Sequence, residues 1–163
     1  MAENPQLDLN PANNNNFIVV FTPHLKELVQ PPIEYFARTV NLPGWSMPGA
    51  GTQYQNADFS MPSNSRTKDE LSIEFILTER LSNLKFFRRW SQMGQKGQGD
   101  ILECFKDIAL LFLDSNKQPI DKWRYLQAFP TMIGPLSLDH GIVDTVPATF
   151  TVNFAFAEET WDE

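Results

Sequence analysis

The chain has 163 residues, with thirteen basic and twenty acidic side chains, a formal net charge of −7 and a pI near 4.8. This length is typical of one domain with one core, and the 42% of hydrophobic residues, thirteen Phe and four Trp among them, can fill it. The acidic balance excludes a protein that grips DNA phosphates, and the single cysteine, Cys104, excludes an intrachain disulfide framework.

The N-terminal segment is polar and rich in asparagine. It predicts a flexible N-terminal arm over residues 1–16, followed by a single domain over residues 17–163. The arm lacks the basic start and the apolar centre of a secretory signal, and no apolar run approaches the roughly 18 residues of a membrane helix. We therefore expect a soluble protein that is not exported by that route.

Short apolar runs predict the strands of the first half. Residues 17–21 are apolar and end before Pro23, as in a buried strand. Residues 33–40 carry apolar and polar side chains on both faces, which suits a strand flanked by protein on both sides. Residues 71–78 alternate between apolar and polar side chains, with Ile76 as the one exception, and are predicted as a third strand.

Residues 42–62 are interpreted as a long loop or an extended hairpin, because Pro and Gly are too frequent at their start for regular structure. Loops longer than about 12 residues are uncommon inside a compact domain unless they are functional. The segment also contains aromatic and Met side chains. These favour contact with a partner over a merely flexible connection.

A helix is predicted over residues 83–93, where Leu84, Phe87 and Trp90 recur every three residues. Ser82 or Asn83 is the expected cap, and Gly94 or Gly97 the expected end. No acidic residue occurs between positions 81 and 99, and five basic ones surround the helix. They form either a solvated polar face or a docking surface for an acidic neighbour: Arg80, Lys85, Arg88, Arg89 and Lys96.

The second half predicts a hairpin and a final strand. Residues 101–113 and 119–129 are apolar-rich segments that flank the polar turn 114–117. Residues 149–156 alternate between apolar and polar side chains, as in a half-buried strand. Seven or eight strands with one helix make an α+β, mainly β domain.

The sequence contains no recognisable catalytic or metal-binding pattern. His24 and His140 lie far apart, without a nucleophile motif beside either. No segment has the Gly-Lys-Ser/Thr ending of a phosphate-binding loop. Asp121, Asp139 and Asp144 are scattered rather than spaced as in a calcium loop. We therefore predict that the protein is not an enzyme and uses no cofactor.

Charge is distributed unevenly along the chain. Residues 61–100 carry seven basic and five acidic side chains, whereas residues 101–163 carry four basic and ten acidic ones. Such asymmetry suits a subunit that sets one surface against a neighbour and exposes an acidic one elsewhere. If copies closed into a ring, the acidic surface would repeat around the axis and repel polyanions.

Residues 129–139 read FPTMIGPLSLD and are followed by the last predicted strand and by Trp161. This order and spacing resemble the tail tube proteins of contractile-tailed bacteriophages. Residues 37–43 look like that family's strand ending in Leu-Pro. Residues 71–78 and the helix with Phe86, Phe87 and Trp90 look like its central strand and single helix. The resemblance extends over almost the whole predicted domain.

The resemblance implies a fold and an assembly. The fold would be two packed antiparallel sheets, a tail-tube-like β-barrel or sandwich, with one flanking α-helix. Six copies would form a ring, and rings would stack into a hollow tube inside a contractile sheath, with an inner wall shared by all subunits. The tube would conduct DNA during ejection without binding it tightly. Its location would be the virion tail, after assembly in the host cytoplasm.

The implied partners are further copies of the chain, the tail sheath protein, and the baseplate and tail terminator proteins, with no membrane. The segment after residue 41 corresponds to the element that reaches the adjoining ring. Ring-to-ring contact is accordingly expected at Leu42, Pro43, Trp45, Met47 and Tyr54. Lumen-lining positions are expected at Glu34, Asp58, Asp107 and Asp121. Contact with the sheath or a neighbouring subunit is expected at Lys85, Arg88 and Arg89.

Three alternatives remain open at this stage. A baseplate protein that initiates the tube would share the fold but occur in one ring. The tube subunit of a phage-like contractile injection system would carry protein instead of DNA. A small ligand-binding β-barrel would suit the aromatic content, although the sequence lacks the convergent polar groups of a pocket.

Overall fold

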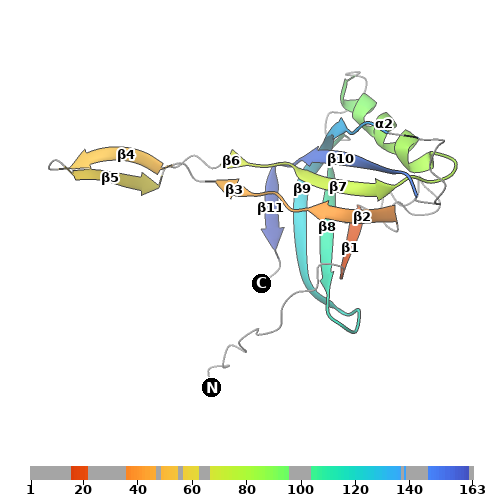
Figure 1. Ribbon diagram of the computed structural model, residues 1–163, viewed down its shortest axis with the longest axis horizontal. Coiled ribbons are helices and arrows are strands. Elements are labelled where there is room, and N and C mark those ends of the chain that lie inside the picture. The colour runs from red at the N-terminus through yellow and green to blue at the C-terminus, as the bar shows by residue number, and fades with distance from the viewer. Residues whose placement is uncertain are drawn as a thin grey trace.

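The computed structural model describes residues 16–21, 36–46, 49–54, 57–62, 67–95, 104–136, 138 and 147–161. These residues form eleven strands and one helix. Figure 1 shows a body of crossing strands and a narrow hairpin that projects from it. Most of the predicted N-terminal arm lies outside the described residues. Its last residue, Asn16, is buried and donates a hydrogen bond from Nδ2 to the carbonyl oxygen of Asp114 at 3.0 Å.

Seven strands form one bent antiparallel sheet. Six of them follow each other in the order β1-β8-β9-β10-β7-β2, and β11 also pairs with β9. Their bounds are β1 (Phe17–Phe21), β2 (Ala37–Asn41), β7 (Leu71–Ile76), β8 (Lys106–Leu113), β9 (Pro119–Ile133), β10 (Thr149–Ala155) and β11 (Glu158–Trp161). Every pairing is antiparallel.

The fifteen-residue strand β9 joins two halves of this sheet. Its first part pairs with β8 and β11, and its last residues pair with β10. At the change of partner, Gln127 has a φ of 52°, which non-glycine residues rarely adopt. Asp107 accepts a hydrogen bond from the Gln127 N–H at 3.0 Å. We call β1, β8, β11 and the first part of β9 half A, and β2, β7, β10 and the end of β9 half B.

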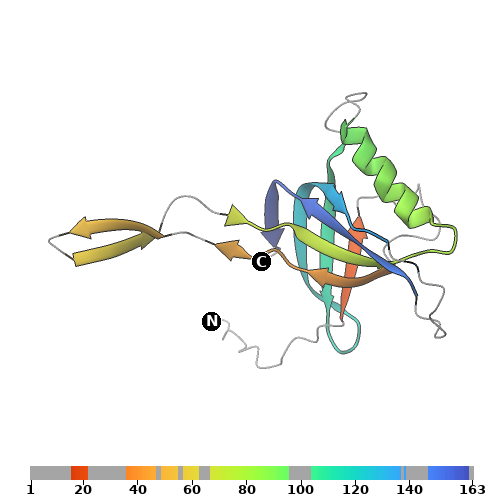
Figure 2. The same cartoon turned by 45° about the horizontal axis from the view of Figure 1, so that its top comes forward.

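The core lies between half A and half B and is completed by the helix α2 (Ser82–Gln95). Figure 2 shows the two halves crossing, with α2 at one side. Phe87 on α2 is fully buried, and its ring centre lies 4.8 Å from that of Phe75 and 6.0 Å from that of Phe154. Buried aromatic side chains of this size supply much of the apolar burial that stabilises a domain.

The helix begins one residue before its predicted start and ends two after its predicted end. Ser82 is its first helical residue, and the Ser82 N–H donates to the Thr78 hydroxyl at 2.9 Å. Asn83 is fully buried and donates to the Ile76 carbonyl oxygen at 2.7 Å. Asn83 therefore fastens the helix to the end of β7. The oxygen that caps the first helical N–H comes from Thr78, whereas the sequence analysis expected the cap at Ser82 or Asn83. Gly94 lies within the last helical turn.

The other predicted elements agree in type and differ mainly in their limits. Residues 17–21 are β1, residues 71–76 are β7 and residues 149–155 are β10. The strand predicted over residues 33–40 is described only from Phe36, and β2 begins at Ala37. The mainly β class with one helix is confirmed among the described residues. The two halves share β9, so they form one open, folded sheet.

Candidate assembly surfaces

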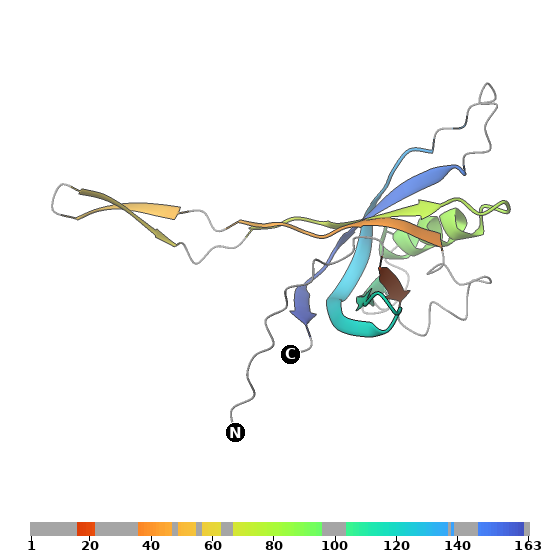
Figure 3. The ribbon, with the colours of Figure 1, turned by 60° about the horizontal axis from the view of Figure 1, so that its bottom comes forward.

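A two-stranded ribbon leaves half B and continues the β2–β7 ladder away from the body. Near the body β3 (Trp45–Ser46) pairs with β6 (Thr67–Lys68), and farther out β4 (Gly49–Tyr54) pairs with β5 (Ala57–Pro62). Figure 3 shows β4 and β5 standing clear of the sheet and of α2. We call β3 to β6 the ribbon. The predicted loop over residues 42–62 is thus an extended hairpin.

The register gives the outer ribbon two different faces. Residues directly opposite each other in an antiparallel pair share a face, and the faces alternate along each strand. One face carries mainly apolar residues, paired as Ala50–Met61, Thr52–Phe59 and Tyr54–Ala57. The other carries small or polar residues, paired as Gly49–Pro62, Gly51–Ser60 and Gln53–Asp58. Predicted contact residue Tyr54 and predicted lumen residue Asp58 therefore occupy opposite faces of the ribbon.

Tight packing fixes the point where the ribbon leaves the body. The Asp69 N–H donates to the carbonyl oxygen of Gly44 at 3.2 Å. A Cβ atom on Gly44 would lie 2.8 Å from the Asp69 Oδ2, so a larger residue would push this side chain away. Pro43 is buried here, whereas Leu42 is 43% exposed and Trp45 is 50% exposed. Leu42 and Trp45 are therefore accessible for contact, and Pro43 has a packing role.

Trp45 is also tied to the C-terminal strand. Its Nε1 donates a hydrogen bond to Oε2 of Glu159 at 2.9 Å, and its ring centre lies 6.2 Å from that of Trp161. The other oxygen of Glu159, Oε1, and the hydroxyl of Tyr125 are both buried without a hydrogen-bond partner within bonding distance among the described residues. Burial, and then the negative charge of Glu159, raise the pKa of Tyr125.

Half B has a mostly polar face and two open edges. The polar residues that alternate with its buried ones are Thr39, Asn41, Ser72, Glu74, Thr149, Thr151 and Asn153. Two apolar residues share this face, because Ile76 lies opposite Thr149 and the exposed Met132 lies opposite Asn153. The Thr39 hydroxyl donates to Oε2 of Glu74 at 3.1 Å, and a register shift leaves Arg38 as an extra residue beside Thr39. Within the described ranges, neither the outer edge of β2 nor that of β9 beyond residue 130 has a strand partner.

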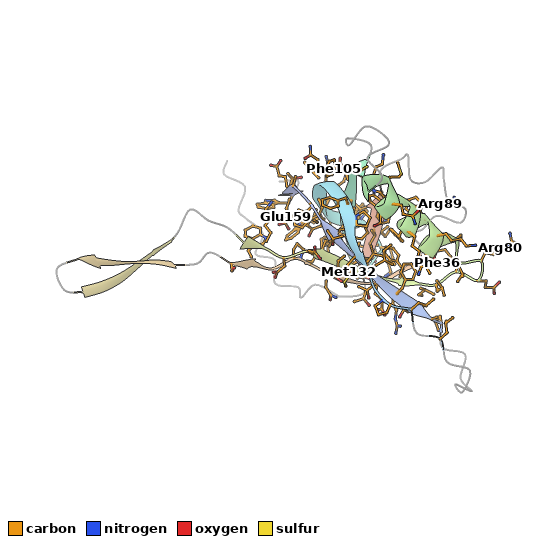
Figure 4. The ribbon with its side chains drawn as sticks, turned by 90° about the horizontal axis from the view of Figure 1, so that it is seen from above. Phe36, Arg80, Arg89, Phe105, Met132 and Glu159 are labelled. Atoms are coloured by element: carbon orange, nitrogen blue, oxygen red, sulfur yellow. The ribbon has the colours of Figure 1, made fainter. Side chains whose placement is uncertain are left out.

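A basic surface lies on the side of α2 that faces away from the core. Lys85, Arg88 and Arg89 are exposed on the helix, and Arg80 is exposed in the turn before it. Figure 4 shows Arg80 and Arg89 on the side of the body opposite the ribbon, whereas Glu159 lies on the ribbon side. We call Arg80, Lys85, Arg88 and Arg89 the basic surface.

No family model and no curated protein matches the chain. Solved structures, however, do match it. It superposes with a TM-score of 0.68 and 12% identity on a chain of the anti-feeding prophage baseplate, over 93% of this chain and 95% of the other. For the sheath–tube complex of the PVC extracellular contractile injection system the TM-score is 0.64 and the identity 16%, over 95% and 93%. The chain has the tail tube fold.

The tail tube fold of this chain is also similar to a second group of proteins. A mutant of the Hcp1 protein from the E. coli EAEC 042 pathovar matches with a TM-score of 0.55 and 9% identity, over 90% of this chain and 89% of the other. The likeness covers nearly the whole length of each chain in all three comparisons. The predicted fold is confirmed by these superpositions.

On the tail tube fold, the predicted site residues fall into separate places. Lys85, Arg88 and Arg89 lie together on α2. The predicted lumen residues are not brought together: Asp107 and Asp121 lie in half A, and Asp58 lies in the ribbon. Met47 and Glu34 lie outside the described residues, and for Tyr54 and Asp58 only the strand position is described.

Sequence reasoning missed the contacts of Lys68, Trp123 and Glu159 at the base of the ribbon. The signal was weak, because β11 has only four residues and its two half-buried positions, Glu159 and Thr160, are adjacent instead of alternating with exposed ones. Among the described residues, no group of three or more His, Cys, Asp or Glu side chains could hold a metal ion. No helix in the described part of the chain is long and apolar enough to cross a membrane.

Proposed function

We propose that the chain is a structural subunit of the tube of a contractile injection system, in which copies close into rings and rings stack into a hollow conduit. The observation that carries this proposal is the tail tube fold, which extends over 95% of the chain in the comparison with a sheath–tube complex. The role needs no reaction, because burial of surface and pairing of strands drive assembly. The proposed subunit is therefore not an enzyme.

Half B supplies the ring contacts in this proposal. Its four strands end in two open edges, the outer edge of β2 and that of the end of β9. An open edge presents unpaired backbone groups that a second chain can complete. Pairing β2 of one copy with β9 of the next would join half B of all copies into one closed barrel. Six copies per ring would agree with the 6-fold symmetrised baseplate structure.

The ribbon supplies the contact between rings. It extends half B along the strand direction, and the register gives it one mainly apolar face. A mainly apolar face gains free energy when a second copy covers it. We propose that the ribbon lies against the adjoining ring, with Leu42, Trp45, Met47 and Tyr54 in the contact region. Pro43 would act by shaping the base of the ribbon.

The face of half B that points away from the core would line the conduit. Thr39, Thr151 and Asn153 are short polar side chains that would stay hydrated, so most of this face would present a polar surface to a passenger, with the exposed Met132 as an apolar residue on it. Glu74 would contribute the acid that the sequence analysis assigned to Asp107 and Asp121. A phage tail that ejects DNA is the finer form of this proposal, and it rests on the sequence resemblance alone.

The basic surface on α2 would face outward, toward a sheath or another acidic partner. Helix α2 packs against the core face of half B through Phe87, opposite the face proposed to line the conduit, and a cluster of positive charge attracts a complementary negative surface. Lys85, Arg88 and Arg89 therefore remain the proposed contact residues. Location in a tail or injection particle follows from the same proposal.

Negative-stain electron microscopy of the purified protein over a range of concentrations tests the proposal. We expect rings of uniform bore and, at higher concentration, tubes made of stacked rings. A persistent monomer at high concentration would contradict it. Mass photometry of the ring fraction would give the number of subunits, and six is the expected number.

A second candidate is the tube-initiating protein of a baseplate. It is favoured by the match to a chain of the anti-feeding prophage baseplate, for which the TM-score is 0.68, against 0.64 for the sheath–tube match. A baseplate initiator would form single rings that do not extend. Tube length at saturating concentration therefore separates the two roles: rings without tubes indicate the initiator.

A further inference from the structure

The two strands at the base of the ribbon are both attached to the end of the chain. In β3, the indole N–H of Trp45 donates to the Glu159 carboxylate at 2.9 Å. The ring of Trp45 lies 6.2 Å from that of Trp161, with an angle of 31° between the ring planes. A hydrogen bond to a carboxylate is about twice as strong as one between neutral groups. The first ribbon strand therefore has both a polar and an aromatic tie to β11.

The second ribbon strand has its own tie to the same segment. In β6, the Nζ of Lys68 donates to the carbonyl oxygen of Ala157 at 2.5 Å. The same ammonium group lies 5.3 Å from the centre of the Phe156 ring, within the range of a cation–π contact. Residues 156–161 therefore hold the ribbon through both of its strands.

The segment 156–161 is in turn anchored on the core strand β9. Glu159 pairs with Tyr125 and Trp161 pairs with Trp123 in the antiparallel register. The ring centres of Trp123 and Trp161 lie 6.1 Å apart, and the Ala157 N–H donates to a β9 carbonyl oxygen at 3.0 Å. Because Tyr125 is fully buried in the core, the position of β11 is fixed relative to the body.

The inner part of the ribbon needs such support. β3 and β6 have two residues each, and two-stranded ribbons are at best marginally stable in water. The outer part stands clear of the body (Figure 3), so its direction depends on the contacts at the base. A segment that must be ordered during binding loses affinity, and one that is held in place beforehand does not.

We propose that residues 156–161 form a brace that fixes the direction of the ribbon, so that the C-terminal strand controls how strongly rings stack. Glu159 and Trp161 are positioning residues that act through Trp45, and the proposal rests on the tube function proposed above. If removal of the brace leaves the ribbon correctly aligned for about a tenth of the time, the apparent stacking affinity falls about tenfold.

The direction of the ribbon can be measured without assembly. Spin labels are attached to cysteines introduced at Ser60 on the ribbon and Asn116 on the body, in a Cys104→Ser background, at concentrations below ring formation. Pulsed electron resonance then reports the distribution of distances between the two labels. We expect a narrow distribution in the parent protein and a clearly broader one in Glu159→Ala and in Trp161→Ala.

The matched control is Glu158→Ala. Glu158 lies in the same strand, is exposed, and pairs with Leu126. Its removal changes the net charge by the same amount as Glu159→Ala, but it should leave the distance distribution narrow.

The variant Trp45→Phe tests the hydrogen bond to Glu159 from its other side, because it keeps an aromatic ring and removes the N–H donor. Combined with Glu159→Ala it should add no further broadening, because both variants break the same bond.

Assembly is then compared by sedimentation and electron microscopy. We expect Glu159→Ala and Trp161→Ala to form rings normally but to need about tenfold more protein to form tubes. A narrow distance distribution in both variants would overturn the brace, whether or not tubes form. A broad distribution with unchanged tube formation would overturn its control of stacking. A parent protein that forms neither rings nor tubes contradicts the tube function, whereas the distance distributions still decide the brace.

Discussion

Asp107 has a structural contact that the sequence analysis did not anticipate. The sequence predicts it as a lumen acid, but its carboxylate accepts the N–H of Gln127 at the bend of β9. Gln127 has a φ of 52° there, and such a conformation costs an ordinary residue roughly 1–2 kcal/mol. The bend decides how half A and half B face each other, so one side chain helps to set the shape of the whole core.

Removal of this contact should destabilise the domain. We expect Asp107→Ala to lower the free energy of unfolding by about 1–2 kcal/mol, because the Gln127 N–H loses a charged acceptor. Asp121→Ala is the control, because the Asp121 carboxylate accepts only the neighbouring Lys122 N–H in the described residues. Gln127→Gly should be neutral or slightly stabilising, since glycine relieves the strain but raises the entropy of the unfolded chain. Urea denaturation measures all three, and equal losses for the two aspartates would contradict this role.

The buried hydroxyl of Tyr125 should make the stability of the fold depend on pH in the alkaline range. Burial and the charge of Glu159 raise its pKa above the ordinary value of 10.0. The unfolded chain therefore releases this proton at a lower pH than the folded one does. The stability it contributes is fully present below about pH 10 and declines as the pH rises above it. A spectrophotometric titration should show one of the three tyrosines ionising late, and Tyr125→Phe should remove that late step.

At the scale of elements, variants of the basic surface on α2 distinguish a contact between copies of the chain from a contact with another, acidic protein. Arg88→Glu combined with Arg89→Glu should leave the thermal unfolding temperature nearly unchanged, because both side chains are exposed. Tube yield should also be unchanged at low and high salt if the surface faces an acidic partner outside the tube. Gln92→Glu, exposed on the same helix, is the control for added negative charge. A loss of tubes that salt reverses would place this surface between copies of the chain.

The elements differed in how well the sequence predicted them, for physical reasons. The strands β7 and β10 and the helix α2 pack one face into the core, so their periodicity is visible in the sequence. The ribbon lies outside the core, and its direction depends on contacts with β11 more than one hundred positions later, such as that of Trp45. The bend of β9 depends on Asp107 and Gln127 from different strands, and no local pattern predicts such a contact.

At the scale of the whole molecule, the two open edges of half B can be tested by chemical linkage. If β2 of one copy pairs with the end of β9 in the next, residues near Asn41 and near Thr131 of neighbouring copies come close enough for a disulfide. We expect cysteine pairs scanned over residues 39–41 and 131–133, in a Cys104→Ser background, to give a ladder of covalent multimers under mild oxidation. The ladder should end at the closed ring.

The position of a ladder's last step distinguishes a closed ring from an open chain. Closure joins the two edges within a finite number of copies, whereas an unclosed repeat of the same contact would extend without limit. A cysteine at Gln92 on α2, paired with one at Thr131, is the matched control, because α2 does not lie at an edge of the sheet and should give no ladder. Equal linkage from the α2 control, or a ladder without an end, would contradict a ring joined through half B.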